Sequence, residues 1–120
     1  MLKQDYLLRQ IESLAMSLAK LFFNTDVVSY EIPEKDSYSE TDILYNKLNK
    51  LVSEGKINEA ENLLFDEVDR SNIEYLRVGI DFYNNLNKLE DKFLEAHDYS
   101  REEIQQGLQD LSSEYGINLV

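Results

Sequence analysis

The sequence predicts an all-α protein, a bundle of about five helices, from three observations. Gly and Pro are scarce, four and one among 120 residues, so few positions favour a break in a helix. Runs of β-branched residues are also scarce. Apolar residues recur at steps of three and four, which is the spacing of one helix face. The length fits one domain over residues 1–120, in which we expect an N-terminal helix (1–23), an acidic loop (24–38) and a helical bundle (39–120).

The first helix is expected from about Leu2 to Phe23. Its main apolar seam steps by four and three residues in turn, through Leu7, Ile11, Leu14, Leu18 and Leu21. A second apolar line runs beside this seam, so the apolar stripe is wider than one helix contact requires. Such a stripe needs burial against at least two neighbours, from this chain or from another. We therefore expect the seam to be the interface of a homodimer.

Residues 24–38 interrupt the helical pattern and are expected to form a surface loop. Asn24 tolerates the left-handed conformation that ends a helix, and Pro33 biases Ile32 away from the helical region. Six acids and one Lys lie between Asn24 and Asn46, which makes this the most acidic part of the chain. Several apolar side chains indicate that the loop packs in part on the bundle, namely those of Val27, Val28, Tyr30 and Ile32.

Two shorter helices are expected next, at about 40–54 and from about Asn58. Ser39 followed by Asp42 resembles a capping box with Asp in place of the usual Glu. Gly55 can adopt the left-handed backbone conformation without steric strain, which suits the turn between the two helices. The Asn58 side chain is expected to cap the second of them.

A long fourth helix is expected from about Asn72 to His97, because seven positions of one stripe repeat in steps of four and three. Within this stripe Gly79 costs about 1 kcal/mol of helix propensity relative to Ala, which a close helix crossing would explain. A fifth helix opens with the capping box of Ser100 and ends at Gly116.

The segment from about residue 40 to 69 resembles a tetratricopeptide hairpin. Such a hairpin carries Gly in its turn and, five residues later, a small residue where the two helices touch; Gly55 and Ala60 have this spacing. Leu64 falls at the large apolar position four residues further on. Because no convincing second copy follows, the resemblance implies a helical hairpin and not a tandem array.

Three stretches carry a wider resemblance: DYLLRQIESLAMSLAKLFF, LVSEGKINEAENLLFDEVD and DYSREEIQQGLQDLSSEYGI. Together they resemble an uncharacterised family of short helical proteins from Firmicutes that carry a domain of unknown function. The resemblance covers most of the chain apart from residues 24–38. It implies an all-helical fold and a bacterial, cytoplasmic setting, and it brings no catalytic residues.

Charge and composition exclude several classes of function. The net charge is −12, from 24 acids and 12 bases, which argues against nucleic-acid binding and against docking on an anionic membrane. Charged residues interrupt the apolar N-terminus, so neither a signal peptide nor a membrane span is expected. Without Cys there is no disulfide or thiolate, and one His cannot build a multi-histidine metal site. We expect no cofactor, and a cytoplasmic protein.

Candidate catalytic residues are few. His97 lies at the end of the fourth predicted helix, where a cation at a helix C-terminus is a better interpretation than a general base. The single His lacks a Glu three residues before it, so the carboxylate–histidine metal motif of helical bundles is missing. The many carboxylates are interpreted as a solvated acidic face, and we assign no catalytic, cofactor-binding or metal-binding residue.

The sequence favours a non-catalytic module for protein–protein interaction or assembly, whose partner is unknown and which forms a homodimer through its first helix. One alternative is an acidic inhibitor that mimics nucleic-acid phosphates, acting through Glu31, Glu34, Asp36, Glu40 and Asp42. Another alternative is a small helical enzyme or ligand-binding protein with a pocket in the bundle, which would need a buried carboxylate with a raised pKa.

Overall fold

A computed structural model gives the structure of the chain and describes residues 2–32 and 38–117. Within these ranges the secondary structure is entirely helical, which confirms the all-α prediction. The helices are α1 (Leu2–Phe23), α2 (Glu40–Ser53), α3 (Ile57–Glu67), α4 (Ile73–Asn87), α5 (Asp91–Ala96) and α6 (Arg101–Glu114). Over the described residues, none of these helices is both long enough and apolar enough to cross a membrane.

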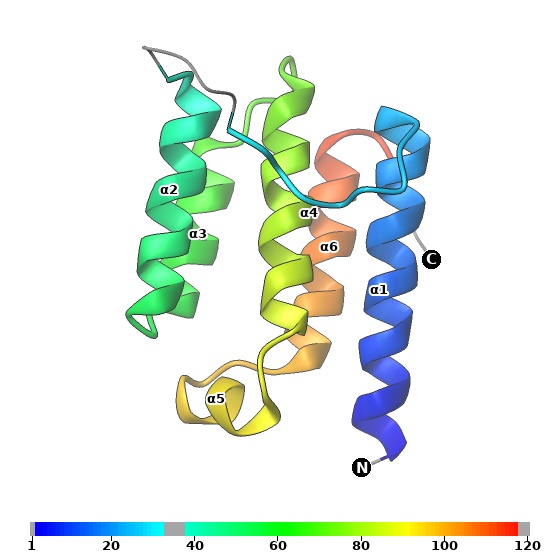
Figure 1. Ribbon diagram of the computed structural model, residues 1–120, viewed down its shortest axis with the longest axis vertical. Coiled ribbons are helices and arrows are strands. Elements are labelled where there is room, and N and C mark those ends of the chain that lie inside the picture. The colour runs from blue at the N-terminus through cyan, green and yellow to red at the C-terminus, as the bar shows by residue number, and fades with distance from the viewer. Residues whose placement is uncertain (1, 33–37, 118–120) are drawn as a thin grey trace.

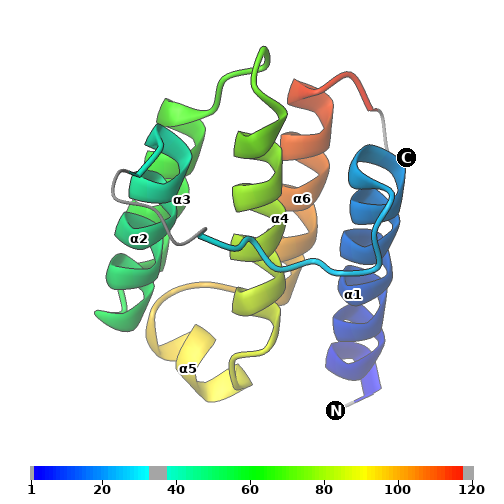
Figure 2. The same cartoon turned by 45° about the horizontal axis from the view of Figure 1, so that its top comes forward.

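The core is built around α4. Figure 1 shows α4 in the middle of the molecule, with α2 and α3 on one side and α1 and α6 on the other. The turned view in Figure 2 keeps this arrangement. Helix α4 packs against α1, α2 and α6, and ten of its 15 residues are buried. A helix buried on so much of its circumference is a central helix, and the others cover it.

Local sequence signals predict most helix ends. Helix α1 has the predicted bounds, and Asn24 after it takes the left-handed conformation with φ of 52°. Both predicted capping boxes form, since the side chains of Ser39 and Ser100 each accept the backbone N–H three residues on. Gly116 follows α6 with φ of 85°. These signals act within one turn of helix, so the local sequence determines them.

Gly79 marks the crossing of α4 and α6. A Cβ atom at this position would collide with the side chain of Leu111 on α6. A side chain at this position would force the buried Leu111 side chain to move, and the close approach of the two helices confirms the crossing predicted from the helix pattern.

The prediction of one long helix over residues 72–97 is wrong, because the structure divides it into α4 and α5. The cause is Arg101 at the start of α6, which is 4% exposed. Its Nη1 donates to the carbonyl of Asn87 (2.6 Å) and its Nη2 donates to the carbonyl of Leu89 (2.7 Å). A continuous helix would use these carbonyls for amides four residues further on. The buried guanidinium takes them instead, and the chain turns.

Helix α3 begins at Ile57, and the predicted capping role of Asn58 is wrong. The N-cap residue is Lys56, whose side chain makes no capping hydrogen bond. The Asn58 amide instead donates to the backbone carbonyl of Asp98, at 3.4 Å. The Asn58 side chain, which the local pattern predicts as a helix cap, therefore makes a long-range hydrogen bond to Asp98 instead.

Helices α2 and α3 form a helical hairpin. Gly55 makes the turn with φ of 78°, and Ala60 and Leu64 are fully buried, as the spacing predicts. Gly55 has a second reason to lack a side chain, because a Cβ atom there would collide with the ring of His97. The resemblance of this hairpin to a tetratricopeptide unit stays a prediction.

Residues 24–32 form a strap, drawn in cyan in Figure 1, that crosses α4 on the way from α1 to α2. Tyr30 is buried and fastens the strap to two helices. Its backbone N–H donates to Asp81 Oδ1 of α4 (3.1 Å), and its hydroxyl donates to Asp42 Oδ1 of α2 (2.6 Å). The predicted partial packing of the loop is confirmed for Val28, Tyr30 and Ile32, and it is wrong for Val27, which is 51% exposed. Pro33 and the rest of the predicted loop up to residue 37 lie outside the described residues.

Candidate functional site

The five residues of the predicted interface on α1 do not form one exposed surface. Leu7, Ile11 and Leu18 are buried, Leu14 is half-buried, and Leu21 is 64% exposed. Helix α1 packs on α4 and on α6 of the same chain. The wide apolar stripe therefore does have two neighbours, and both belong to its own fold.

His97 lies at the end of α5 in a structural setting. Its Nδ1 atom is 2.8 Å from the carbonyl oxygen of Phe93, and the two rings are 4.3 Å apart. The other edge of the imidazole faces the backbone of Gly55 in the turn of the hairpin. The ring thus joins α5 to the hairpin. Nor do the described residues contain a group of three or more His, Cys, Asp or Glu that could hold a metal ion.

A groove between α3 and α6 is the strongest candidate for a functional site. Its volume is about 440 Å³. We call it the α3–α6 groove and define it by its lining residues, which are Glu61, Asn62 and Phe65 of α3 with Glu103, Gln106, Gly107, Asp110 and Glu114 of α6. The lining holds four carboxylates, two amides and one phenyl ring, and none of these residues is basic.

Tyr83 of α4 lies beneath the α3–α6 groove and joins its two walls. On one side its ring packs directly on Gly107, where even a Cβ atom would collide with it. On the other side its hydroxyl donates to Glu61 Oε2 at 2.6 Å. Gly107 is therefore the residue that lets α6 pack onto the ring, and Tyr83 sets the separation of the two walls.

Glu61 is held in place by two tyrosines. The hydroxyls of Tyr83 (2.6 Å) and Tyr99 (2.8 Å) both donate to its Oε2 atom. Burial, helped by the adjacent Glu61 charge, raises the pKa of both tyrosines above the ordinary value, so both remain neutral donors. The two hydrogen bonds hold the Glu61 carboxylate in place, so its side chain has little rotational entropy left to lose on binding.

The carboxylates of α6 differ in how firmly they are engaged. Glu103 accepts the backbone N–H of Ser100 at 2.7 Å in the capping box. Asp110 accepts the amide of Gln106 at 2.9 Å, one turn away. Both side chains are exposed, and their charges therefore face the solvent in the groove.

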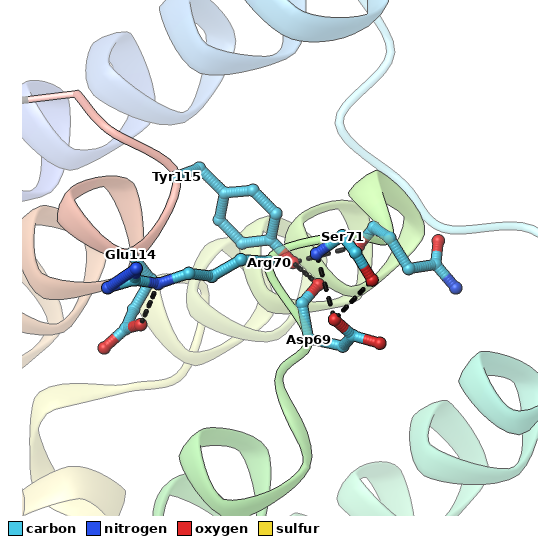
Figure 3. Close-up of polar contacts among 6 residues, drawn as sticks. Asp69, Arg70, Ser71, Glu114 and Tyr115 are labelled. Carbon is cyan, nitrogen blue, oxygen red and sulfur yellow. Dashed lines mark hydrogen bonds and ion pairs between the residues drawn. The ribbon is translucent and has the colours of Figure 1, made fainter.

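A polar corner, shown in Figure 3, lies at the Glu114 end of the groove. The Tyr115 hydroxyl lies 2.9 Å from the carbonyl oxygen of Asp69 and 3.0 Å from that of Asn72, which ties the end of α6 to the α3–α4 turn. Burial, together with the Asp69 charge, raises the pKa of Tyr115 to about 12. Arg70 pairs with Glu114 at 3.3 Å and partly neutralises that carboxylate. The other three carboxylates of the groove therefore carry most of its negative potential.

The sequence alone did not assign Glu61, Tyr83, Tyr99 or Gly107 to a functional site. One signal was present: Gly107 lies inside an otherwise regular helix, as Gly79 does, and such a Gly indicates a close approach. A second signal was Glu61, an acid directly beside the buried stripe position Ala60. Neither signal says that α3 and α6 lie on either side of Tyr83.

Comparison with known proteins places the chain in one family. A search found no match to the chain among curated proteins or solved structures. Residues 1–116 match a family of unknown function, DUF6483. This agrees with the expected domain of unknown function, whereas the bacterial group stays a prediction. The chain therefore belongs to the DUF6483 family of unknown function.

Proposed function

We propose that the protein is a non-catalytic interaction module whose α3–α6 groove binds a basic segment of a protein partner. The observation that carries the proposal is the groove itself, with four carboxylates and no base among its lining residues. Charge complementarity of this kind steers a partner of opposite charge and selects against acidic partners. The partner is defined here by its chemistry, a Lys- or Arg-rich segment with an apolar residue for Phe65.

The proposal is supported by the number of carboxylates and, more strongly, by the fixed position of one of them, that of Glu61. Glu61 is already held by two hydroxyl donors, so a partner cation does not have to order it. Asp110 and Glu103 are exposed and reachable on the opposite wall. Because exposed charges are screened by salt, binding should weaken steeply as ionic strength rises.

The two alternatives gain less support. For the nucleic-acid mimic, Asp42 is buried and its carboxylate accepts bonds from Tyr30 and from the backbone of Ser39, so it does not face a partner. Glu34 and Asp36 lie outside the described residues, and Glu31 and Glu40 are exposed. For an enzyme, the buried Asp81 with its raised pKa lies under the strap, away from the α3–α6 groove.

Self-association through α1 is a second proposal, in which Leu21 is the one residue kept from the predicted seam. Among the side chains of this helix that the structure describes, the exposed large apolar ones are Tyr6, Met16 and Leu21. If a second copy covers them, Met16→Glu and Leu21→Glu should convert a dimer into a monomer without unfolding the chain. Native mass spectrometry measures this directly, and a wild-type protein that is monomeric at tens of micromolar contradicts the proposal.

The groove proposal is tested with labelled peptides of about 14 residues, about four helical turns. One set is rich in Lys and Arg and the other in Asp and Glu, with the same apolar residues. Fluorescence anisotropy should detect binding of the basic set only. Asp110→Lys should weaken this binding about five- to tenfold, about 1 kcal/mol. Glu12→Lys, the same charge reversal on an exposed position of α1, is the matched control. Equal loss in both variants would mean that the peptides bind the net charge and not the groove.

A further inference from the structure

The walls of the α3–α6 groove are two helices of similar length. Helix α3 has 11 residues and α6 has 14. The Tyr83 side chain joins them, with its ring on Gly107 of α6 and its hydroxyl on Glu61 of α3. At this level the walls are therefore separated by the Tyr83 ring, its hydrogen bond and the Glu61 side chain. The two helices border an open groove, and a third helix can lie along it.

The backbone of the occupant also needs partners for its hydrogen bonds. An extended peptide leaves its N–H and C=O groups unpaired unless a strand edge or side chains meet them. The described residues form no strand. The groove offers the amides of Asn62 and Gln106, and that of Gln106 already donates to Asp110. A helix pairs its own backbone N–H and C=O groups, so it needs only side-chain contacts from the groove.

The charges on α6 follow a helical repeat. Glu103, Asp110 and Glu114 are spaced by seven and four residues, with Gln106 between them. At about 1.5 Å per residue they extend along about 16 Å of the groove. A helix lying along α6 presents Lys or Arg at the same repeat when these residues recur every three or four positions. The half-buried Phe65 on the opposite wall can meet one apolar side chain of the same helix.

We propose that the α3–α6 groove receives an amphipathic basic helix of about three turns, with Lys or Arg along one edge and an apolar anchor that contacts Phe65. This inference rests on the proposed function and names the conformation and residue pattern of the partner. The helix completes a three-helix arrangement with α3 and α6, and Tyr83 lies beneath all three.

The test compares three labelled peptides of identical composition. The first places Lys or Arg at positions i, i+4, i+7 and i+11 and Leu beside them. The second permutes the residues so that the bases surround the helix. The first peptide carries its one Pro at a terminus. The third differs from it only in that this Pro changes places with a central residue, which costs about 3 kcal/mol of helix propensity. Anisotropy gives the affinities, and circular dichroism reports whether the peptide gains helix on binding.

The first peptide should bind at least about tenfold more tightly than either of the others, with a gain of helix signal on binding. Asp110→Lys and Phe65→Ala should each reduce that advantage, whereas Glu12→Lys should not. If all three peptides bind equally and Asp110→Lys weakens all of them, the groove binds basic segments but the helical partner is wrong. If each peptide binds the Asp110→Lys variant as tightly as the Glu12→Lys variant, the proposed function fails as well.

Discussion

Two clusters of tyrosine and carboxylate lie on opposite faces of α4 and show how one kind of contact serves two purposes. Under the strap, Tyr30 binds Asp81 and Asp42, and both carboxylates are buried. Under the groove, Tyr83 and Tyr99 are buried, but Glu61, whose carboxylate they share, is only half-buried and lines the groove.

The difference lies in which partner is buried. Asp81 and Tyr83 are two residues apart in α4, about 200° around the helix, so they face opposite sides. In the strap cluster the carboxylates accept hydrogen bonds from within the chain, and these bonds link the strap to α2 and α4. In the groove cluster the tyrosines are inside and fix a charge that points out. The first arrangement links elements of the fold, whereas we propose that the second presents a carboxylate to a partner.

The largest expected effect comes from crowding the groove cluster. Gly107→Leu places a branched side chain where even one carbon collides with the Tyr83 ring. We expect a loss of about 3 kcal/mol in the free energy of unfolding, measured by urea denaturation, and loss of peptide binding. Gln106→Leu, at the exposed neighbouring position, should change stability by less than about 0.5 kcal/mol. A stable Gly107→Leu protein would show that Tyr83 does not set the wall spacing.

Removing the hydroxyl from the strap cluster should have the next largest effect. Tyr30→Phe keeps the ring packed on Tyr45 but removes the donor to the buried Asp42. A buried carboxylate that loses a donor costs about 2 kcal/mol, so stability should fall by this amount and peptide binding should stay unchanged. Tyr38→Phe, at an exposed position before α2, is the control and should be neutral.

The equivalent change in the groove cluster should cost less stability. Tyr83→Phe removes one donor from Glu61, which keeps Tyr99 and is open to water, so we expect a loss of about 1 kcal/mol. Peptide binding should weaken about two- to threefold, because Glu61 is held less firmly. If Tyr83→Phe costs as much stability as Tyr30→Phe and leaves binding intact, the two clusters do not differ in purpose.

The smallest effect concerns the pH dependence of the strap cluster. Burial raises the pKa of Asp81, although the Tyr30 amide opposes this shift. A raised folded-state pKa means that the charged form is penalised in the fold. Its contribution to stability is therefore greatest below the unfolded-state pKa and declines as the pH rises through the folded value. Asp81→Asn removes this contribution.

The Asn85 amide donates to Asp81 Oδ2 at 3.0 Å. The amide that Asp81→Asn introduces can still accept the Tyr30 N–H, and the Asn85 amide can rotate to present its oxygen to the new NH₂ group. The variant should therefore gain stability relative to wild type between about pH 4 and about pH 7, as measured by urea denaturation at each pH. All other carboxylates are the same in both proteins, so the difference isolates Asp81. A constant difference across this range contradicts the raised pKa.

The elements that the sequence predicted well depend on nearby residues. The capping boxes of Ser39 and Ser100 and the end of α1 at Asn24 involve contacts within one helical turn. Gly79 was also predicted correctly, because Gly in an apolar stripe has few explanations other than a close crossing. The wide stripe of α1 correctly indicated two neighbours, but a stripe does not say which chain supplies them.

The elements that were missed depend on residues far apart in the chain. The break between α4 and α5 needs Arg101, which lies 14 residues after the carbonyl of Asn87 that it binds. The groove needs Glu61 of α3 to lie across from Asp110 of α6, although each alone is an ordinary acid in an acidic chain. Tertiary contacts decide both features, and helix periodicity carries no information about them.

Arg101 also has a consequence for how the molecule opens. Its guanidinium binds the carbonyls of Asn87 and Leu89 and the carboxylate of Asp91, and the Asn87 amide in turn donates to the carbonyl of Leu8 in α1. The end of α4, the short α5 and the start of α6 are therefore all held together by the hydrogen bonds of one side chain, that of Arg101. Helix α5 has six residues and is too short to protect its amides alone. In native-state hydrogen exchange these three segments should therefore lose protection together, as one cooperative unit.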